Sequence, residues 1–173
     1  MAKKEKQKLR IIPLGGVDGI GKNITVFEYG NDIIIVDCGL AFPDEEMFGV
    51  DLVIPDMTYL YENKDKIRGL VLTHGHEDHI GAIPYLFKRF KTQIYGTRLT
   101  LGILEGKLEE HGLLEGSSLM EISAGQTIKL GVFSIEFISV THSIPGAVAL
   151  CIETPVGRII HTGDFKIDFT PVG

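Results

Sequence analysis

The run His74–His79 (His-Gly-His-Glu-Asp-His) places three imidazoles and the Asp78 carboxylate within six consecutive residues. It directly follows the apolar stretch Gly69–Thr73, which is typical of a buried strand. Imidazole and carboxylate are ligands that suit zinc, manganese or iron. So many polar groups at the end of a buried strand would be costly unless something satisfies them. The run therefore predicts a site for two metal ions.

The spacing within the run indicates how two ions would share it. His74 and His76 lie two residues apart, so in extended backbone both point to the same side and can bind one ion. Asp78 and His79 fall where the loop turns into a helix, and they can face a second ion beside the first. A bridging ligand and further donors must then come from elsewhere in the chain.

The further donors are predicted at the ends of two later strands. His142 and Asp164 each follow an apolar run, as the first metal-binding residues do, and we expect both to join the site. His161 lies one residue inside its strand and is predicted to pack there or to support a ligand. His111 ends a helical stretch, where a histidine interacts favourably with the helix dipole, and no chemistry is assigned to it.

The composition favours a single globular domain. The chain has 173 residues, of which 44% are hydrophobic and 23% are charged. The longest apolar runs, such as Ile33–Val36, are far shorter than the roughly 20 residues that span a bilayer, so no membrane partner is expected. Cys38 and Cys151 lie in apolar stretches and are predicted to be buried thiols. Because the first residues contain no apolar signal segment, we expect a cytoplasmic protein.

The charge distribution limits how the protein could bind nucleic acid. A net charge of -6 argues against a protein that coats nucleic acid by charge alone. Five of the first ten residues are nevertheless basic. They predict a flexible basic tail over residues 1–8, with an arm that contacts RNA as the alternative.

The elements that would position these residues alternate between strands and helices. Early strands are predicted at Leu9–Leu14, Asn23–Tyr29, Asp32–Asp37, Gly69–Thr73 and Gln93–Tyr95, the second and third joined by a turn at Gly30-Asn31. Helices are predicted over Met57–Lys66, with Asp56 as N-cap, over Ile80–Phe90 and over Thr97–His111. A later antiparallel series is predicted at Ser118–Ile122, Thr127–Leu130, Phe133–Val140, Ala147–Glu153 and Arg158–His161. This order predicts a layered α/β or α+β domain, in which helices cover one face of a mixed sheet.

A second motif, Gly16–Asn23, fits the GxxxxGK template of a nucleotide-binding P-loop. Asn23 stands where that template needs a serine or threonine hydroxyl for magnesium. The following residues, Ile24–Tyr29, are β-branched and aromatic, so a strand is predicted where a P-loop requires a helix. We therefore expect a glycine-rich turn that borders the metal cleft.

Taken together, these residues resemble the metallo-β-lactamase superfamily. The run His74–His79 matches its HxHxDH signature, Asp37 its first motif, His142 its third and Asp164 its fourth. The finer pattern is similar to the ribonuclease J family, in the β-CASP branch of RNA-processing nucleases. The stretches that carry this likeness are Leu14–Asn23, Thr73–Gly81, Leu108–Gly112, Thr141–Pro145 and His161–Lys166.

The resemblance implies a four-layer αββα sandwich, of which residues 9–173 would form the N-terminal portion. The β-CASP insert, the remainder of the metallo-β-lactamase domain and a C-terminal region would lie outside this chain. The implied ligands are His74, His76 and His142 for one ion, Asp78 and His79 for the other, and Asp164 as the bridge. Asp37 would order the loop behind the ligands. The two ions would be zinc, with manganese as the alternative.

The chemistry implied by the resemblance is metal-dependent hydrolysis of RNA, by 5′-to-3′ exonuclease and by endonuclease cleavage, in RNA maturation and decay. Asp78 would also orient the attacking hydroxide. The implied partners are single-stranded RNA with a 5′-monophosphate and a second subunit, identical or paralogous. Two alternatives are hydrolysis of a small thioester or lactam, and a non-catalytic half-domain that binds RNA or a partner. The 173-residue chain alone is expected to be inactive, because the second ion would lack one ligand.

Overall fold

The structure, a computed structural model, describes residues 7–169 and arranges them in three layers: helices, a six-stranded sheet and a four-stranded sheet. This confirms the predicted layered α/β class. Most of the predicted basic tail, residues 1–6, lies outside the described residues, while Gln7 and Lys8 are exposed. Within the described range, no helix is both long and apolar enough to cross a membrane.

The first sheet contains six strands, which lie side by side in the order of the chain. They are β1 (Leu9–Pro13), β2 (Thr25–Tyr29), β3 (Asp32–Val36), β4 (Ile67–Val71), β5 (Gln93–Gly96) and β6 (Ser118–Glu121). The first three strands pair antiparallel, with the predicted turn between β2 and β3, and the remaining pairs are parallel. The placement of Ser118–Ile122 in the antiparallel series was therefore wrong. A helix between β5 and β6 supplies the crossover that parallel neighbours need.

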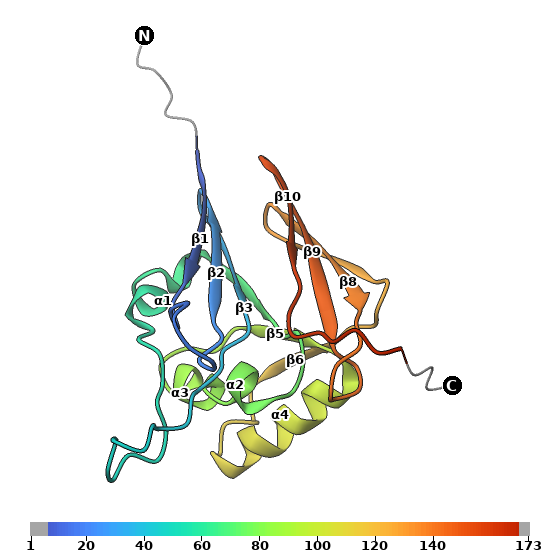
Figure 1. Cartoon of the computed structure of the whole chain (residues 1–173). Helices are drawn as coiled ribbons and strands as arrows, with labels where there is room; N and C mark the ends of the chain where they lie inside the picture. Colours follow the sequence, from blue (N-terminus) through green and yellow to red (C-terminus); the bar gives the residue numbers. More distant parts are fainter. Residues whose placement is uncertain (1–6, 170–173) are drawn as a thin grey trace.

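The helices pack against one face of this sheet. They are α1 (Thr58–Glu62), the 3-10 turn η1 (Lys64–Lys66), α2 (Glu77–Ile80), α3 (Ile83–Phe87) and α4 (Arg98–Glu110). In Figure 1, α2, α3 and α4 lie at the bottom and α1 lies at the left. The long helix predicted at Thr97–His111 is confirmed as α4, flanked by Thr97 and His111 as its caps.

The other two predicted helices are each broken into two. Over Met57–Lys66 the break is at Asn63, whose side-chain amide donates to the carbonyl of Tyr59. The N-cap is Met57 rather than Asp56, although the Asp56 carboxylate still accepts the N–H of Thr58.

The second break, within the helix predicted at Ile80–Phe90, separates α2 from α3. Pro84 lies in the first turn of α3, where its missing N–H is tolerated, so a new helix begins there. The helical stretch also begins earlier than predicted, at Glu77, which places Asp78 and His79 on α2 itself.

The second sheet is an antiparallel meander, as predicted. Its strands are β7 (Thr127–Leu130), β8 (Phe133–Ser139), β9 (Val148–Thr154) and β10 (Gly157–His161), in the spatial order β10-β9-β8-β7. Figure 1 shows this sheet standing beside the first one, with α2, α3 and α4 below.

Strand β3 shows how the two cores arise from one sequence pattern. Ile33 and Ile35 belong to the core between the first sheet and the helices, whereas Ile34 and Val36 belong to the core between the two sheets. Successive side chains of a strand point to opposite faces, so a continuous apolar run fills both layers. The ends of β3 and β4 are therefore fixed from both sides. The two cysteines are buried and free, as predicted.

Candidate metal centre

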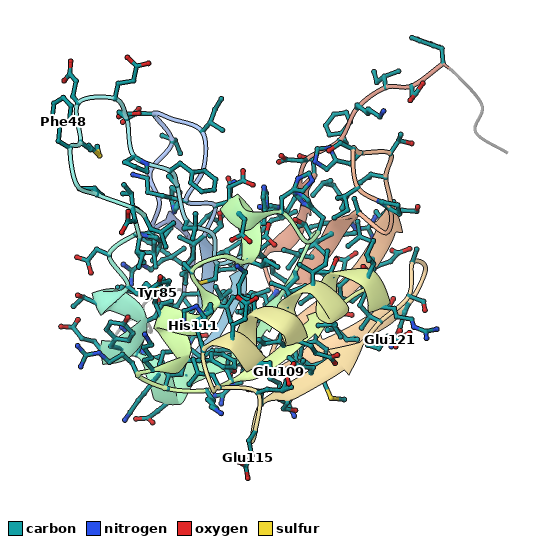
Figure 2. All side chains as sticks on the ribbon, turned by 90° about the horizontal axis from the view of Figure 1, so that it is seen from below. Phe48, Tyr85, Glu109, His111, Glu115 and Glu121 are labelled. Atoms are coloured by element: carbon teal, nitrogen blue, oxygen red, sulfur yellow. The ribbon has the colours of Figure 1, made fainter. Side chains whose placement is uncertain are left out.

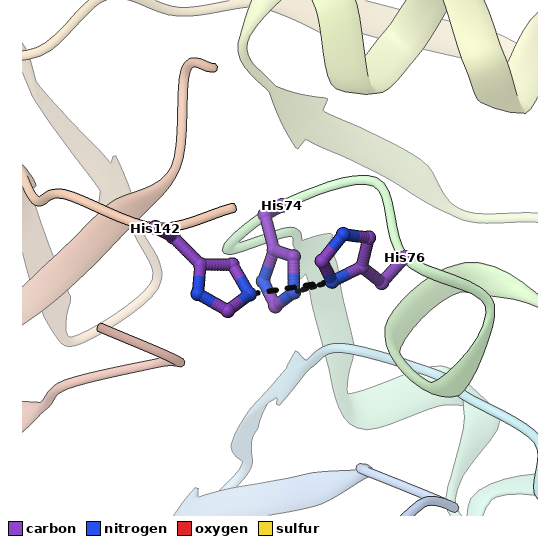
Figure 3. A group of neighbouring side chains, drawn as sticks. All are labelled: His74, His76 and His142. Carbon is purple, nitrogen blue, oxygen red and sulfur yellow. Dashed lines mark hydrogen bonds between the residues drawn. The ribbon is translucent and has the colours of Figure 1, made fainter. Parts of the chain in front are cut away.

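The segments that follow β4, β8 and β10 meet at one edge of the molecule, the first of them including helix α2. They bring together all six residues for which metal binding was predicted: His74, His76, Asp78, His79, His142 and Asp164. The first four follow β4 directly, whereas the last two arrive from the second sheet. Figure 3 shows His142 reaching from its separate segment toward His74 and His76.

Three imidazoles converge in what we call the three-histidine site: His74, His76 and His142. The Nε2 atom of His74 lies 3.0 Å from Nδ1 of His76, and Nε2 of His142 lies 3.3 Å from the same Nδ1 atom. The three ligand atoms all lie within 4.8 Å of one another. One divalent ion could therefore contact all three.

A second group, which we call the mixed site, contains Asp78, His79 and Asp164. Nε2 of His79 lies 3.6 Å from Oδ2 of Asp78 and 3.5 Å from Oδ1 of Asp164. The other carboxylate oxygen of Asp164, Oδ2, lies 3.9 Å from Nε2 of His142. Asp164 thus presents one oxygen toward each site, which is the arrangement that a bridging carboxylate requires.

Asp37 lies behind these ligands and is almost fully buried. Its Oδ2 atom accepts hydrogen bonds from Nδ1 of His79 and from the hydroxyl of Thr73, both at 2.8 Å. Its Oδ1 atom accepts the backbone N–H of Thr73, also at 2.8 Å. The φ angle of Asp37 is 59°, a left-handed conformation that Asp tolerates better than most residues. Asp37 therefore contacts the Nδ1 edge of the His79 ring, which points away from the mixed site.

The electrostatic surroundings of the two buried histidines differ. Burial and the neighbouring His79 lower the pKa of His74 to about 4, so this imidazole is neutral at pH 7. Burial would also lower the pKa of His79, but the hydrogen bond and charge of Asp37 outweigh it and raise the pKa. Burial would raise the pKa of Asp37, yet His79 and the N–H of Thr73 hold it below its usual value.

Thr73 and Asn23 contact the proposed ligands, although their sequence positions did not single them out. The Thr73 hydroxyl lies 3.0 Å from Nδ1 of His74. The Asn23 amide nitrogen donates to Oδ2 of Asp78 at 3.1 Å and lies 3.0 Å from Nε2 of His79. Each has a weak signal in the sequence, since Thr73 immediately precedes the histidine run and Asn23 ends the glycine-rich motif. Neither signal indicates a contact between distant segments.

The glycine-rich motif borders the centre as expected, and a strand follows it. Strand β2 begins two residues after Asn23, so the prediction that a strand and not a P-loop helix comes next is confirmed. The backbone N–H of Asn23 also donates to the carbonyl of Asp78. A cavity of about 310 Å³ opens beside the mixed site, and its lining includes Asn23, Asp37, His79 and Asp164.

The remaining histidines lie where the sequence placed them. The ring of His161 packs edge-on against Phe27, and its Nδ1 atom accepts the N–H of Gly163. His111 ends α4, where its ring contacts Tyr85; Figure 2 labels both residues on the helical face.

The donor set fits divalent metal ions. Three convergent imidazoles with neighbouring carboxylates are the ligands that zinc and related ions use in proteins. Hydrogen bonds from the far side of His74 and His79 hold both rings with Nε2 directed into the centre, as is usual for metal-binding histidines.

Comparison with known proteins agrees with this architecture. A ribonuclease J of Synechocystis sp. is 53% identical over 97% of this chain, and one of Thermus thermophilus is 53% identical over 95%. Ribonuclease J2 of Bacillus subtilis is 44% identical over 99% of the chain. The chain spans only 27%, 30% and 31% of these three relatives, respectively.

Solved structures with low sequence identity share the fold. A protein of unknown function from Enterococcus faecalis superposes with a TM-score of 0.72 at 23% identity, covering 92% of this chain and 44% of its own. Zinc-bound PqqB from Methylobacterium extorquens superposes with a TM-score of 0.59 at 12% identity, covering 80% and 51%. Residues 17–168 match the model of the metallo-beta-lactamase superfamily, nearly the whole described chain. The chain therefore belongs to the metallo-beta-lactamase superfamily.

Proposed function

We propose that the protein is a metal-dependent ribonuclease that hydrolyses RNA phosphodiesters, by both 5′-to-3′ exonuclease and endonuclease cleavage. The observation that carries this proposal is the position of Asp164, whose two oxygens face His79 on one side and His142 on the other. Such a bridge is the feature that would join two ion sites into one hydrolytic centre. The ribonuclease J relatives supply the substrate class.

The proposed ligands are the three-histidine site for one ion and the mixed site for the other, with Asp164 shared. Zinc is the proposed metal, with manganese as the alternative, because imidazole and carboxylate accept both. When bound, two such ions lower the pKa of water to about 7 and offset the charge of a phosphate.

The residues of the chain would then bind and orient the reactants. His76, His142 and Asp164 are partly exposed, so they form the side of the centre that a phosphodiester can approach. Asp78 is the group proposed to orient the attacking water, because its carboxylate is partly exposed and is held by the Asn23 amide. Asp37 keeps the His79 ring fixed during this step.

Further parts of the proposal concern the protein as a whole. We propose that this chain is the N-terminal portion of the catalytic domain, since it spans less than a third of its ribonuclease J relatives. By itself it would then be inactive. The proposed substrate is single-stranded RNA with a 5′-monophosphate, the proposed partner a second identical or paralogous subunit, and the proposed location the cytoplasm.

The test uses the full-length protein and two substrates, a 5′-monophosphorylated RNA and a small thioester. We expect cleavage of the RNA, its loss on chelation and its return when Zn²⁺ or Mn²⁺ is added. The His142→Ala variant should lose this activity, whereas His111→Ala, a matched change at the end of α4, should keep it. Hydrolysis of the thioester with no cleavage of RNA would contradict the proposal, as would RNA cleavage that resists chelation.

A further inference from the structure

We infer that Thr73 is a positioning residue that connects the two ion sites through Asp37. Its hydroxyl lies 2.8 Å from Oδ2 of Asp37 and 3.0 Å from Nδ1 of His74. His79 contacts the same Oδ2 atom, at 2.8 Å. One buried carboxylate therefore reaches a histidine of each site, His79 directly and His74 through the Thr73 hydroxyl. This inference rests on the proposed two-ion centre.

The direction of each hydrogen bond follows from counting protons. An ionised carboxylate can only accept, so the Thr73 hydroxyl donates its single proton to Asp37. The hydroxyl oxygen of Thr73 then accepts a hydrogen bond from His74, which requires the proton of His74 to be on Nδ1. The Nε2 atom of His74 is consequently unprotonated and directed toward the three-histidine site. The same logic places a proton on Nδ1 of His79, whose donor role is to Asp37.

The four side chains of this hydrogen-bond network are buried, so they cannot exchange their partners for water. Asp37, Thr73, His74 and His79 are each at most 2% exposed. A buried polar group that loses its partner is costly, so water cannot readily replace the Thr73 hydroxyl. The backbone of Thr73 is fixed as well, because its N–H donates to Asp37 and its carbonyl accepts from Val148.

Thr73 also lies against the segment that carries the bridging carboxylate. A Cβ atom added to Gly163, which adopts a φ of 55°, would lie 3.0 Å from the Cβ atom of Thr73. This close contact belongs to the hydrocarbon part of the side chain. Replacing the hydroxyl by a methyl group therefore preserves the packing while it removes the link to His74.

The experiment measures Zn²⁺ binding in the full-length protein and in three variants. Thr73→Val removes the hydroxyl at nearly constant volume, and Thr73→Ser restores it. Thr100→Val is the matched control, because Thr100 is equally buried but its hydroxyl contacts Thr97 and no histidine. Calorimetric titration resolves the two binding steps. We expect Thr73→Val to weaken one step by about 10- to 100-fold, as loss of a ligand-supporting hydrogen bond does.

The remaining outcomes are equally specific. Thr73→Ser and Thr100→Val should bind both ions as the unmodified protein does. If the unmodified protein binds two ions and Thr73→Val binds them unchanged, the inference about Thr73 is wrong while the proposed function stands. If the unmodified protein binds no Zn²⁺, the proposed centre itself fails.

A second measurement does not depend on the folding of the valine variant. Long-range ¹H–¹⁵N correlation spectra of the unmodified protein report which nitrogen of each histidine carries the proton. We expect His74 to carry it on Nδ1. A proton on Nε2 of His74 in the metal-free protein would overturn the inference without any substitution.

Discussion

The two halves of the candidate centre are built in different ways. Asp37, Thr73, His74 and His79 form a buried half, in which each polar side chain is hydrogen-bonded within the core. His76, His142 and Asp164 form a less buried half, which we call the exposed half; the side chain of Asp164 is 47% exposed and that of His142 is 16% exposed. The buried half is held by the ends of β3 and β4 and by helix α2, which carries His79, whereas the exposed half is held by loops. Loss of a buried-half residue should therefore affect folding and metal binding, and loss of an exposed-half residue metal binding alone.

The largest effect is expected at Asp37. Asp37→Ala would leave Nδ1 of His79 and two donors of Thr73 buried without their acceptor. Removing one partner of a buried pair typically lowers the free energy of unfolding by about 3–5 kcal/mol. Urea unfolding measures this change. Asp37→Asn, which tolerates the left-handed backbone and keeps one acceptor, should be intermediate. A loss below about 1 kcal/mol would contradict the distinction between the halves.

A substitution at Gly39 tests whether close backbone packing also stabilises the buried half. A Cβ atom at this position would lie 1.5 Å from the carbonyl oxygen of Asp78, so Gly39→Ala must displace the backbone that carries Asp78 and His79. We expect unfolding free energy to fall by about 1–3 kcal/mol, as in overpacked cores.

Gly102→Ala on α4 is the control for this change, because a Cβ atom there meets nothing within 4 Å. Alanine favours a helix over glycine by up to about 1 kcal/mol, so this variant should be slightly more stable than the unmodified protein. Equal destabilisation by the two substitutions would show that the contact with Asp78 is unimportant.

Glu28 on β2 provides a buried carboxylate outside the centre. Burial would raise its pKa, but the Tyr59 hydroxyl, Lys66 and Arg10 outweigh it and hold the pKa below its ordinary value of 4.5. Stabilisation by this charge is therefore complete above about pH 4.5 and is lost as the pH falls through the lower folded-state pKa.

Glu28→Gln should accordingly lower the unfolding free energy by about 1 kcal/mol at pH 6, and the difference should shrink at more acidic pH. Urea unfolding of both proteins across this range measures it. Metal content should not change, because Glu28 contacts none of the proposed ligands. A difference that grows as the pH falls would contradict the assigned direction of the pKa shift.

The smallest effect on stability is expected at His142, in the exposed half. Its ring contacts His74, His76 and Asp164, but it comes from a loop rather than from a strand or helix of the core. In the presence of a chelator, His142→Ala should change the unfolding free energy by no more than about 0.5 kcal/mol. A decrease in unfolding free energy as large as that of Asp37→Ala would contradict the proposed difference between the two halves.

The sequence indicated which residues gather at the candidate centre better than it indicated the side chains that support them, Asp37 excepted. The proposed ligands were selected because they follow apolar strands and match a family pattern, and they are His74, His76, Asp78, His79, His142 and Asp164. Thr73 and Asn23 were not selected, because their roles arise from contacts with residues 36 and 55 positions away in the chain. Nothing local to a threonine or an asparagine indicates such a contact.

The errors in the predicted fold have two different causes, one non-local and one local. Strand β6 is four residues long, and only the crossover through α4 determines that it pairs parallel with β5. The break between α2 and α3 did have a local signal, because Pro84 lacks the N–H that a continuous helix would use. The strands of the second sheet were placed to within a residue at each end, and two of its three connections, β7 to β8 and β9 to β10, are two-residue turns that depend mainly on local sequence.

The most direct test of the two-ion centre is the metal content per chain of the purified full-length protein, determined by elemental analysis together with the His79→Ala and His142→Ala variants. We predict two divalent ions per chain in the unmodified protein and a loss in each variant, from the mixed site in the first and from the three-histidine site in the second. Full retention of metal in both variants would contradict the account.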